Sequence, residues 1–190
     1  NVDDDLDFVA WGPQAERKPF ATSFVDGTRA DGTLRYPYIP FNDTSFTVAA
    51  WVRCGESNSA DDQVILEQRE SGTANKTLHL VIRNRRPLMG FWSNDLPGVT
   101  IVDDGAWHHI VFVYDEAAQK QRIYVDGRLD AERTATPYKG TVGDTYIGSP
   151  AVGSGRRLNG LLDELLILPY AATDAEIKAW YGMGAPFYDG

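Results

Sequence analysis

Short apolar runs, separated by clusters of Gly, Asn, Asp and Pro, follow one another along most of the chain. This pattern is typical of an all-β protein. The run from Thr44 to Arg53 is the clearest example, because every second residue from Phe46 to Val52 is apolar and shares one face of a strand. Further strands are predicted at residues 20–25, 33–39, 63–69, 77–83 and 88–92, with a turn at 85–87 and an edge position marked by Pro37.

The second half of the chain holds a strand that is apolar on both faces, from Trp107 to Tyr114. Such a strand is expected in the middle of a layered fold. Strands at 121–125 and 128–131 flank Asp126-Gly127, a dipeptide that favours a tight type I′ hairpin. With runs at 141–148 and 158–168 the chain reaches about a dozen strands, which must close as a sandwich or barrel to cover their faces.

One helix is predicted after the last strand. Thr173 and Glu176 have the spacing of a capping box, and Gly182 is a helix stop signal. Between them, apolar residues at 177, 180 and 181 form one stripe. A helix of this length needs a sheet to pack against, so it is expected to cover one face of the sandwich.

Composition limits the function classes. The chain has 190 residues, 43% of them hydrophobic, which is enough for a globular core. A net charge of −9 argues against nucleic acid as a partner. The chain has no run of about 18 apolar residues, so membrane insertion is not predicted. The single Cys54 follows an apolar strand and is expected to be buried.

A single domain over residues 1–190 is predicted, because no repeat or low-complexity linker divides the chain. The prediction assigns residues 1–19 to an N-terminal extension, about 20–181 to the core and 182–190 to a tail. Since the sequence starts at Asn1 without a methionine, it is expected to be part of a longer protein.

Five segments occur in the order found in one known family. They are FTVAAWVR, WHHIVFVYD, QRIYVDGRL, TYIGS and LNGLLDELLILPYAATDAEIKAWY. The chain therefore resembles laminin-G-like domains of the concanavalin-A-like lectin/glucanase superfamily, over roughly Phe20 to Tyr181. The resemblance implies an all-β fold, a two-sheet antiparallel jelly-roll sandwich with one short C-terminal helix. The tail GMGAPFYDG is also similar to segments that follow such domains in phage tail or fibre proteins.

The resemblance implies a calcium ion at the rim of the sandwich. Asp26, in FVDG, and Asp163, in LLDEL, are the candidate metal ligands, and carbonyls of the 26–33 loop would complete the coordination shell. The alternative is that Asp26 forms a turn and Asp163 accepts a backbone amide.

Glycan binding is the function that the family analogy favours. A sugar site combines an aromatic ring with polar groups, and three loops offer both kinds of residue. The candidates are Trp92, Asn94, Asp95, Asn58, Asp62 and Tyr138. Trp51 and Trp180 are assigned to packing, and His79 to a scaffold role.

The sequence lacks a recognisable catalytic motif. Glucanases with this sandwich place two carboxylates on alternate strand positions, so that both face one cleft. Asp163 and Glu164 are adjacent, and therefore point to opposite faces. A non-catalytic carbohydrate-binding or adhesion module of a larger extracellular or virion protein is thus predicted. Its partners would be a glycan or cell-surface polysaccharide and neighbouring domains. The alternatives are a structural or protein-interaction module of a phage tail or fibre, and a glycoside hydrolase or polysaccharide lyase.

Overall fold

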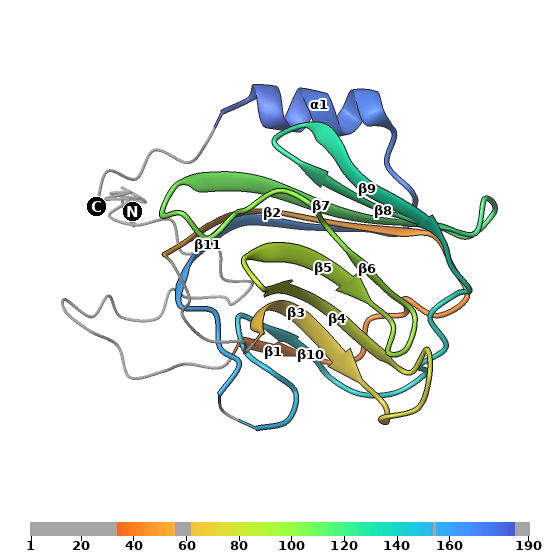
Figure 1. Cartoon of the computed structure of the whole chain (residues 1–190). Helices are drawn as coiled ribbons and strands as arrows, with labels where there is room; N and C mark the ends of the chain where they lie inside the picture. Colours follow the sequence, from red (N-terminus) through yellow and green to blue (C-terminus); the bar gives the residue numbers. More distant parts are fainter. Residues whose placement is uncertain (1–33, 56–61, 154, 185–190) are drawn as a thin grey trace, which may run out of the picture. The chain divides into compact units, whose positions relative to one another are not determined.

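The computed structural model describes residues 34–55, 62–153 and 155–184. Within these ranges two antiparallel sheets pack face to face, and one helix lies on the outside of the second sheet (Figure 1). The first sheet has six strands in the order β1-β10-β3-β4-β5-β6. Their bounds are β1 Leu34–Tyr36, β3 Gln63–Arg69, β4 Thr77–Arg83, β5 Arg86–Gly90, β6 Asp95–Pro97 and β10 Thr145–Ile147.

The second sheet has five strands in the order β11-β2-β7-β8-β9. Their bounds are β2 Phe46–Cys54, β7 Trp107–Asp115, β8 Lys120–Val125, β9 Arg128–Thr134 and β11 Gly160–Leu168. β7 is the central strand, as its apolar residues on both faces predicted. The predicted all-β two-sheet antiparallel sandwich with one short C-terminal helix is confirmed.

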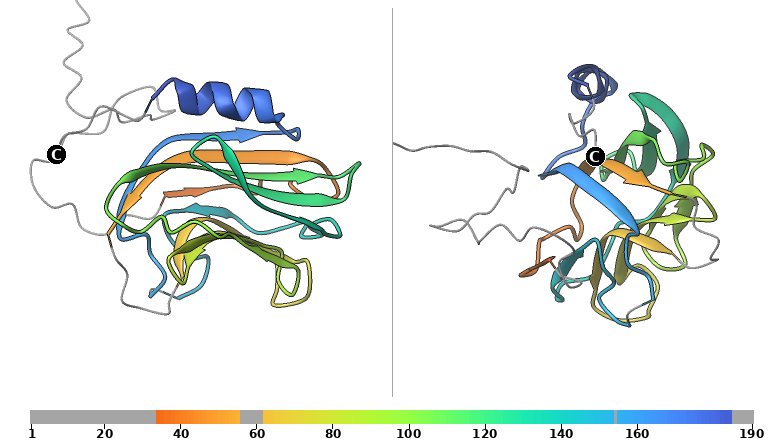
Figure 2. Two further views of the ribbon diagram at one scale, coloured as in Figure 1. Left: turned by 45° about the horizontal axis from the view of Figure 1, so that its top comes forward. Right: turned by 90° about the vertical axis from the view of Figure 1, so that its left-hand side faces the viewer.

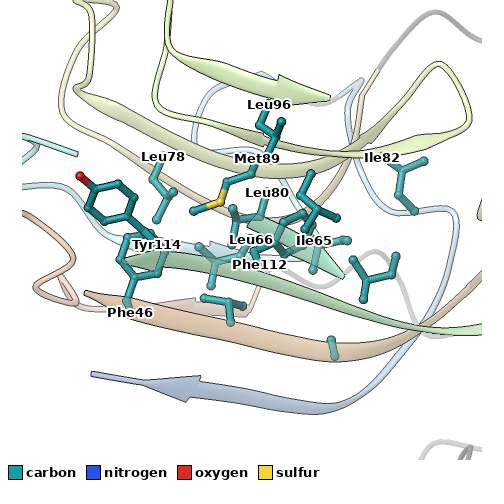
Figure 3. Close-up of a cluster of buried hydrophobic side chains, with 14 of the residues drawn as sticks. Phe46, Ile65, Leu66, Leu78, Leu80, Ile82, Met89, Leu96, Phe112 and Tyr114 are labelled. Atoms are coloured by element: carbon teal, nitrogen blue, oxygen red, sulfur yellow. The ribbon is translucent and has the colours of Figure 1, made fainter. Parts of the chain in front are cut away.

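Side chains from both sheets meet in one apolar core (Figure 3). From the five-stranded sheet, Phe46 and Phe112 point inward, and from the six-stranded sheet Leu80 and Met89 do so, each at most 1% exposed. Because each Å² of buried apolar surface contributes about 25 cal/mol, such a core is the main favourable contribution to folding. Cys54 also lies here, and burial raises the pKa of its thiol to about 12, so it is an inert core residue.

The helix α1, Asp174–Gly182, covers the outer face of the five-stranded sheet (Figure 2). The predicted capping box is present, because Thr173 and Glu176 each bond the other's backbone amide. Ile177 is fully buried against Val111 and Val113 of β7. This is the only helix among the described residues, and it lacks the length and hydropathy needed to span a membrane.

Three details differ from the predicted pattern. The turn expected at 85–87 is formed by Asn84 and Arg85, whose φ angles of 50° and 70° are left-handed, so Arg86 and Pro87 belong to β5. β10 is shorter than the predicted 141–148 strand, and β6 was not predicted at all. The predicted strand 20–25 and the extension 1–19 lie outside the described residues.

Candidate functional site

A pocket of about 400 Å³ is lined by residues on the outer face of the six-stranded sheet. In Figure 1 this sheet lies on the other side of the core from α1, so its outer face is turned away from the helix. Charged side chains and one tryptophan dominate its lining. The lining residues are Asp62, Glu67, Arg69, Thr77, His79, Arg83, Trp92, Val152 and Arg156.

The alternation of β4 explains why polar groups gather on this face. Leu78, Leu80 and Ile82 point into the core. Because successive side chains of a strand point to opposite faces, His79 and Arg83 point outward. β3 contributes Glu67 and Arg69 to the same face, where they pair in register with His79 and Thr77.

A glycine shapes the floor of the pocket. Glu67, His79, Gly90 and Asp95 lie in register across β3, β4, β5 and β6. Since Gly90 has no side chain, the imidazole of His79 extends over β5, and its Nε2 lies 3.4 Å from Oδ2 of Asp95. A Cβ atom at position 90 would lie 2.0 Å from that Nε2, so any other residue there would have to displace the imidazole of His79 or the strand. Glycine at this position therefore permits the close approach of His79.

A network of ion pairs fixes the charged groups at one end of the pocket. Arg83 donates from Nε and Nη2 to the two carboxylate oxygens of Asp62, at 2.6 and 2.8 Å. Arg156 lies 3.5 Å from Asp62 and 3.0 Å from the buried Glu67. Bidentate Arg–carboxylate pairs are strong and geometrically specific, so these groups form a preorganised wall.

Two carboxylates of the network are held in the ionised form. Burial pushes the pKa of Asp62 upward, but the hydrogen bonds and charge of Arg83, together with Arg156, outweigh burial and leave that pKa below its ordinary value. Burial likewise opposes the effect of His79 and Arg83 on Asp95, whose pKa is also lowered. Neither group is therefore suited to donate a proton near neutral pH.

Trp92 occupies a strained position at the tip of the β5–β6 hairpin. Its φ is 65° and that of Ser93 is 56°, so both turn residues are left-handed. Bulky side chains rarely adopt this conformation, which Asn and Gly accept more readily. The indole is 41% exposed, it meets the edge of His79, and the guanidinium of Arg69 lies 5.8 Å from its ring centre. Such strain often marks a functional position.

The structure brings some predicted glycan-site residues together and separates others. Trp92 and Asp62 line the pocket, and Asp95 contacts its His79 and Arg83. Tyr138 is a core residue with no exposed surface, because its ring packs against Phe91, so it cannot serve as a surface platform.

Asn94 is also a scaffold residue. It is 7% exposed, and its amide nitrogen is used in hydrogen bonds to Asn75 and to the backbone carbonyl of Thr136. Asn94 therefore anchors the hairpin that carries Trp92. Asn58 lies outside the described residues.

The sequence of the chain matches one known protein family. Residues 26–178 match the family described as the concanavalin A-like lectin/glucanases superfamily. The chain belongs to this superfamily. No curated protein matches the chain at a significant level.

Solved structures share the superfamily fold at low identity. A protein from Bacteroides ovatus that is proposed to bind carbohydrate aligns with 77% of this chain and 43% of its own, at 19% identity and a TM-score of 0.59. Domain 4 of the arabinanase AbnA from Geobacillus stearothermophilus, in complex with arabinotriose, aligns with 77% of this chain and 71% of its own (18% identity, TM-score 0.60). The Ruminococcus gnavus sialidase module CBM40, bound to sialyllactose, aligns with 73% and 83% (17%, 0.59). Trypanosoma rangeli sialidase aligns over 26% of its length (18%, 0.60).

The calcium that the superfamily resemblance implies has one described candidate ligand. Asp163 lies at a bulge of β11, and its Oδ1 accepts the amide hydrogen of Glu164 at 2.7 Å. Asp26 and the whole 26–33 loop lie outside the described residues. No three acidic, histidine or cysteine side chains of the described ranges gather as a metal-binding group. The described residues alone therefore do not supply a calcium shell, which needs six to eight oxygens.

Sequence reasoning missed five ionisable residues of the pocket, which are Glu67, Arg69, His79, Arg83 and Arg156. His79 was predicted to be a scaffold residue because it is isolated in the sequence. The available signal was the period-two pattern of β4, in which polar residues at 77, 79 and 83 alternate with leucine and isoleucine. That pattern predicts a polar outer face, but it does not show which groups meet there.

Proposed function

We propose that this chain is a non-catalytic carbohydrate-binding module, and that its glycan site is the pocket beside Trp92. The observation that carries the proposal is a half-exposed indole, held in a strained turn, next to a fixed array of charged groups. A binding site commonly combines an apolar or aromatic surface with a few polar groups that fix orientation. Here the indole offers a face for a sugar ring, and the polar groups offer partners for hydroxyls.

The polar groups match the needs of a sugar. Hydroxyls both donate and accept hydrogen bonds, and the pocket presents guanidinium donors, carboxylate acceptors and the imidazole of His79. Ion pairs hold Asp62, Arg83 and Arg156 in place before any ligand arrives. This order reduces the entropy lost on binding.

Superfamily neighbours support a glycan ligand. One solved neighbour is in complex with arabinotriose and another with sialyllactose. One shallow site is expected to bind with a dissociation constant near 1 mM, about −4 kcal/mol. Several copies displayed together would raise the avidity.

The proposed setting is a larger extracellular or virion protein, in which the module attaches its parent to a glycan or cell-surface polysaccharide. The neighbour from Bacteroides ovatus shows that this fold occurs within longer chains, since the match covers 43% of its length. A purely structural role in a phage tail or fibre is the alternative. It would leave the pocket without a ligand.

The state of the carboxylates supports binding over hydrolysis. A glycosidase needs a general acid whose pKa is raised. The pKa values of Asp62 and Asp95 are lowered instead, and Glu67 is 1% exposed beside Arg156.

The test is a glycan array probed with the multimerised domain, as wild type and as Trp92→Ala. Loss of binding in Trp92→Ala alone is expected. Tyr170→Ala is the matched control, because Tyr170 is 42% exposed but lies beside α1. If the wild-type domain binds no glycan, the result supports the alternative, a structural role in a phage tail or fibre. If reducing ends appear when the domain is incubated with the bound glycan, the module is an enzyme.

A further inference from the structure

The three guanidinium groups of the pocket are not equivalent. Arg83 and Arg156 are engaged with carboxylates at 2.6 to 3.5 Å. Arg69 has no carboxylate within ion-pair distance in the part of the chain that the structure describes. Its guanidinium lies over the indole ring of Trp92 instead.

The position of Arg69 keeps its charge available. A guanidinium that lies against an aromatic face is attracted by the π electrons, while its N–H bonds point outward in the plane of the group. Arg69 sits at the end of β3, in register with Thr77 and at the opposite end of the pocket lining from the Arg83–Asp62 pair. Among the described residues, the pocket thus holds one cation without a carboxylate partner, next to its aromatic platform.

This arrangement is unusual for the protein as a whole. The chain carries 27 acidic and 18 basic side chains, so its net charge is −9 and its surface generally repels anions. The pocket nevertheless gathers three arginines, and the carboxylates of Asp62, Glu67 and Asp95 lie near Arg83 and Arg156 rather than near Arg69. A guanidinium that these carboxylates do not pair, beside an aromatic ring, favours an anionic group on the ligand.

We infer that the pocket selects carboxylated sugars, and that Arg69 is the group that recognises the carboxylate. The inference rests on the proposed glycan-binding function and names its ligand class: a uronic or sialic acid residue that contacts Trp92 and places its carboxylate on the fork of Arg69. A planar carboxylate fits this fork through two parallel hydrogen bonds, whereas a neutral sugar leaves the charge without a partner.

The experiment compares acidic probes with neutral counterparts by isothermal titration. The pairs are sialyllactose with lactose, and trigalacturonic acid with its methyl ester. Wild type is expected to bind at least one acidic probe about tenfold tighter than its neutral counterpart, as a charge-assisted pair predicts. Arg69→Gln is expected to remove that difference, and Arg69→Lys to restore part of it, because lysine keeps the charge but not the fork.

Arg128→Gln is the matched control. It removes one exposed arginine from β9, on the other sheet, and changes the net charge by the same amount. It should bind like wild type. Melting temperatures of all variants exclude unfolding as a cause.

The outcomes separate the two proposals. Equal binding of acidic and neutral probes, both lost in Trp92→Ala, would keep the carbohydrate-binding function and overturn the inference. A preference for acidic probes that persists in Arg69→Gln would overturn the role of Arg69. A stronger preference for a sulfated probe such as a heparin disaccharide would overturn the carboxylate assignment. Failure to bind any probe or array glycan would remove both proposals.

Discussion

The imidazole of His79 occupies the space in which a side chain at position 90 would stand. This contact joins two strands of the six-stranded sheet, and it brings His79 within 3.4 Å of Asp95 on a third strand. The pocket floor and the packing of the sheet therefore depend on the same residue.

Replacing Gly90 by alanine should disturb both. The added methyl group must displace the ring or the strand, which costs about 1–3 kcal/mol of unfolding free energy by overpacking. Glycan affinity should fall as well, because His79 moves away from Asp95. Urea unfolding and glycan titration measure the two effects. Gly182→Ala is the control, since a Cβ there meets open space at the end of α1. Wild-type stability in Gly90→Ala would mean that the ring has room to move.

Trp92 and Ser93 allow strain and recognition to be separated. Both residues have left-handed backbone angles. Ser93→Gly should stabilise the domain by about 0.5–1 kcal/mol and leave glycan binding intact. Trp92→Asn places a turn-compatible residue at the tip, so it should keep the stability but abolish binding. Thermal melting with a glycan array tests the pair. A large loss of stability in Trp92→Asn would show that the indole serves packing.

His108 and His109 should have opposite effects on pH-dependent stability. Hydrogen bonds to Asp126 and Asp104 outweigh burial and raise the pKa of His108. The folded state thus holds this proton more tightly. The stabilisation is complete below the unfolded pKa of about 6.5, and it is lost as the pH rises through the higher folded pKa.

His109 has the reverse sign. It packs against Trp51, burial lowers its pKa, and the charge of Asp126 only partly offsets burial. The unfolded state therefore binds this proton more tightly, and stability from His109 increases as the pH rises through the folded pKa toward about 6.5.

Single substitutions should reveal the two contributions. In His108→Gln, which keeps the His109 contribution, the unfolding free energy should rise with pH up to about 6.5; in His109→Gln, which keeps the His108 contribution, it should fall as the pH rises above about 6.5. Denaturant titrations at several pH values give these slopes. Identical slopes in the two variants would contradict the opposite assignments.

Calcium remains a prediction of the superfamily resemblance. If Asp163 and the 26–33 loop bind the ion, calcium at 100 times its dissociation constant should stabilise the domain by about 2.7 kcal/mol. Melting curves in millimolar calcium and in chelator measure this effect. Asp163→Asn should abolish it, and Glu164→Gln, at the neighbouring exposed position, should not. The same melting temperature in calcium and in chelator would exclude Asp26 and Asp163 as calcium ligands.

Short sequence motifs predicted a turn correctly where its residues favour the backbone angles that the turn needs. Asp126-Gly127 forms the expected left-handed turn, with φ angles of 51° and 71°, because both residues accept that conformation. Asn84-Arg85 and Trp92-Ser93 form turns of the same left-handed kind, yet only Asn84 among these four residues favours it. At those hairpins the pairing of β4, β5 and β6 overrides local preference, so the sequence did not locate them.

The candidate site was less predictable for a different reason. Trp92, Asp62 and Asp95 stood out in the sequence as exposed polar or aromatic residues. Arg156 reaches the pocket from a loop more than ninety residues beyond Asp62 in the chain, and the two groups come within 3.5 Å only because the sheets fold together. A partnership of this kind depends on tertiary structure, and period-two patterns contain no information about it.

The position of α1 has a consequence for how the chain is made. The helix follows every described strand in the sequence, and β11, which pairs with β2, comes directly before it. During synthesis the apolar outer face of β7 and the open edge of β2 must therefore wait for more than fifty further residues before they are covered. A nascent chain in this state exposes apolar surface and an unpaired strand edge, the two features that make partly folded chains prone to aggregate.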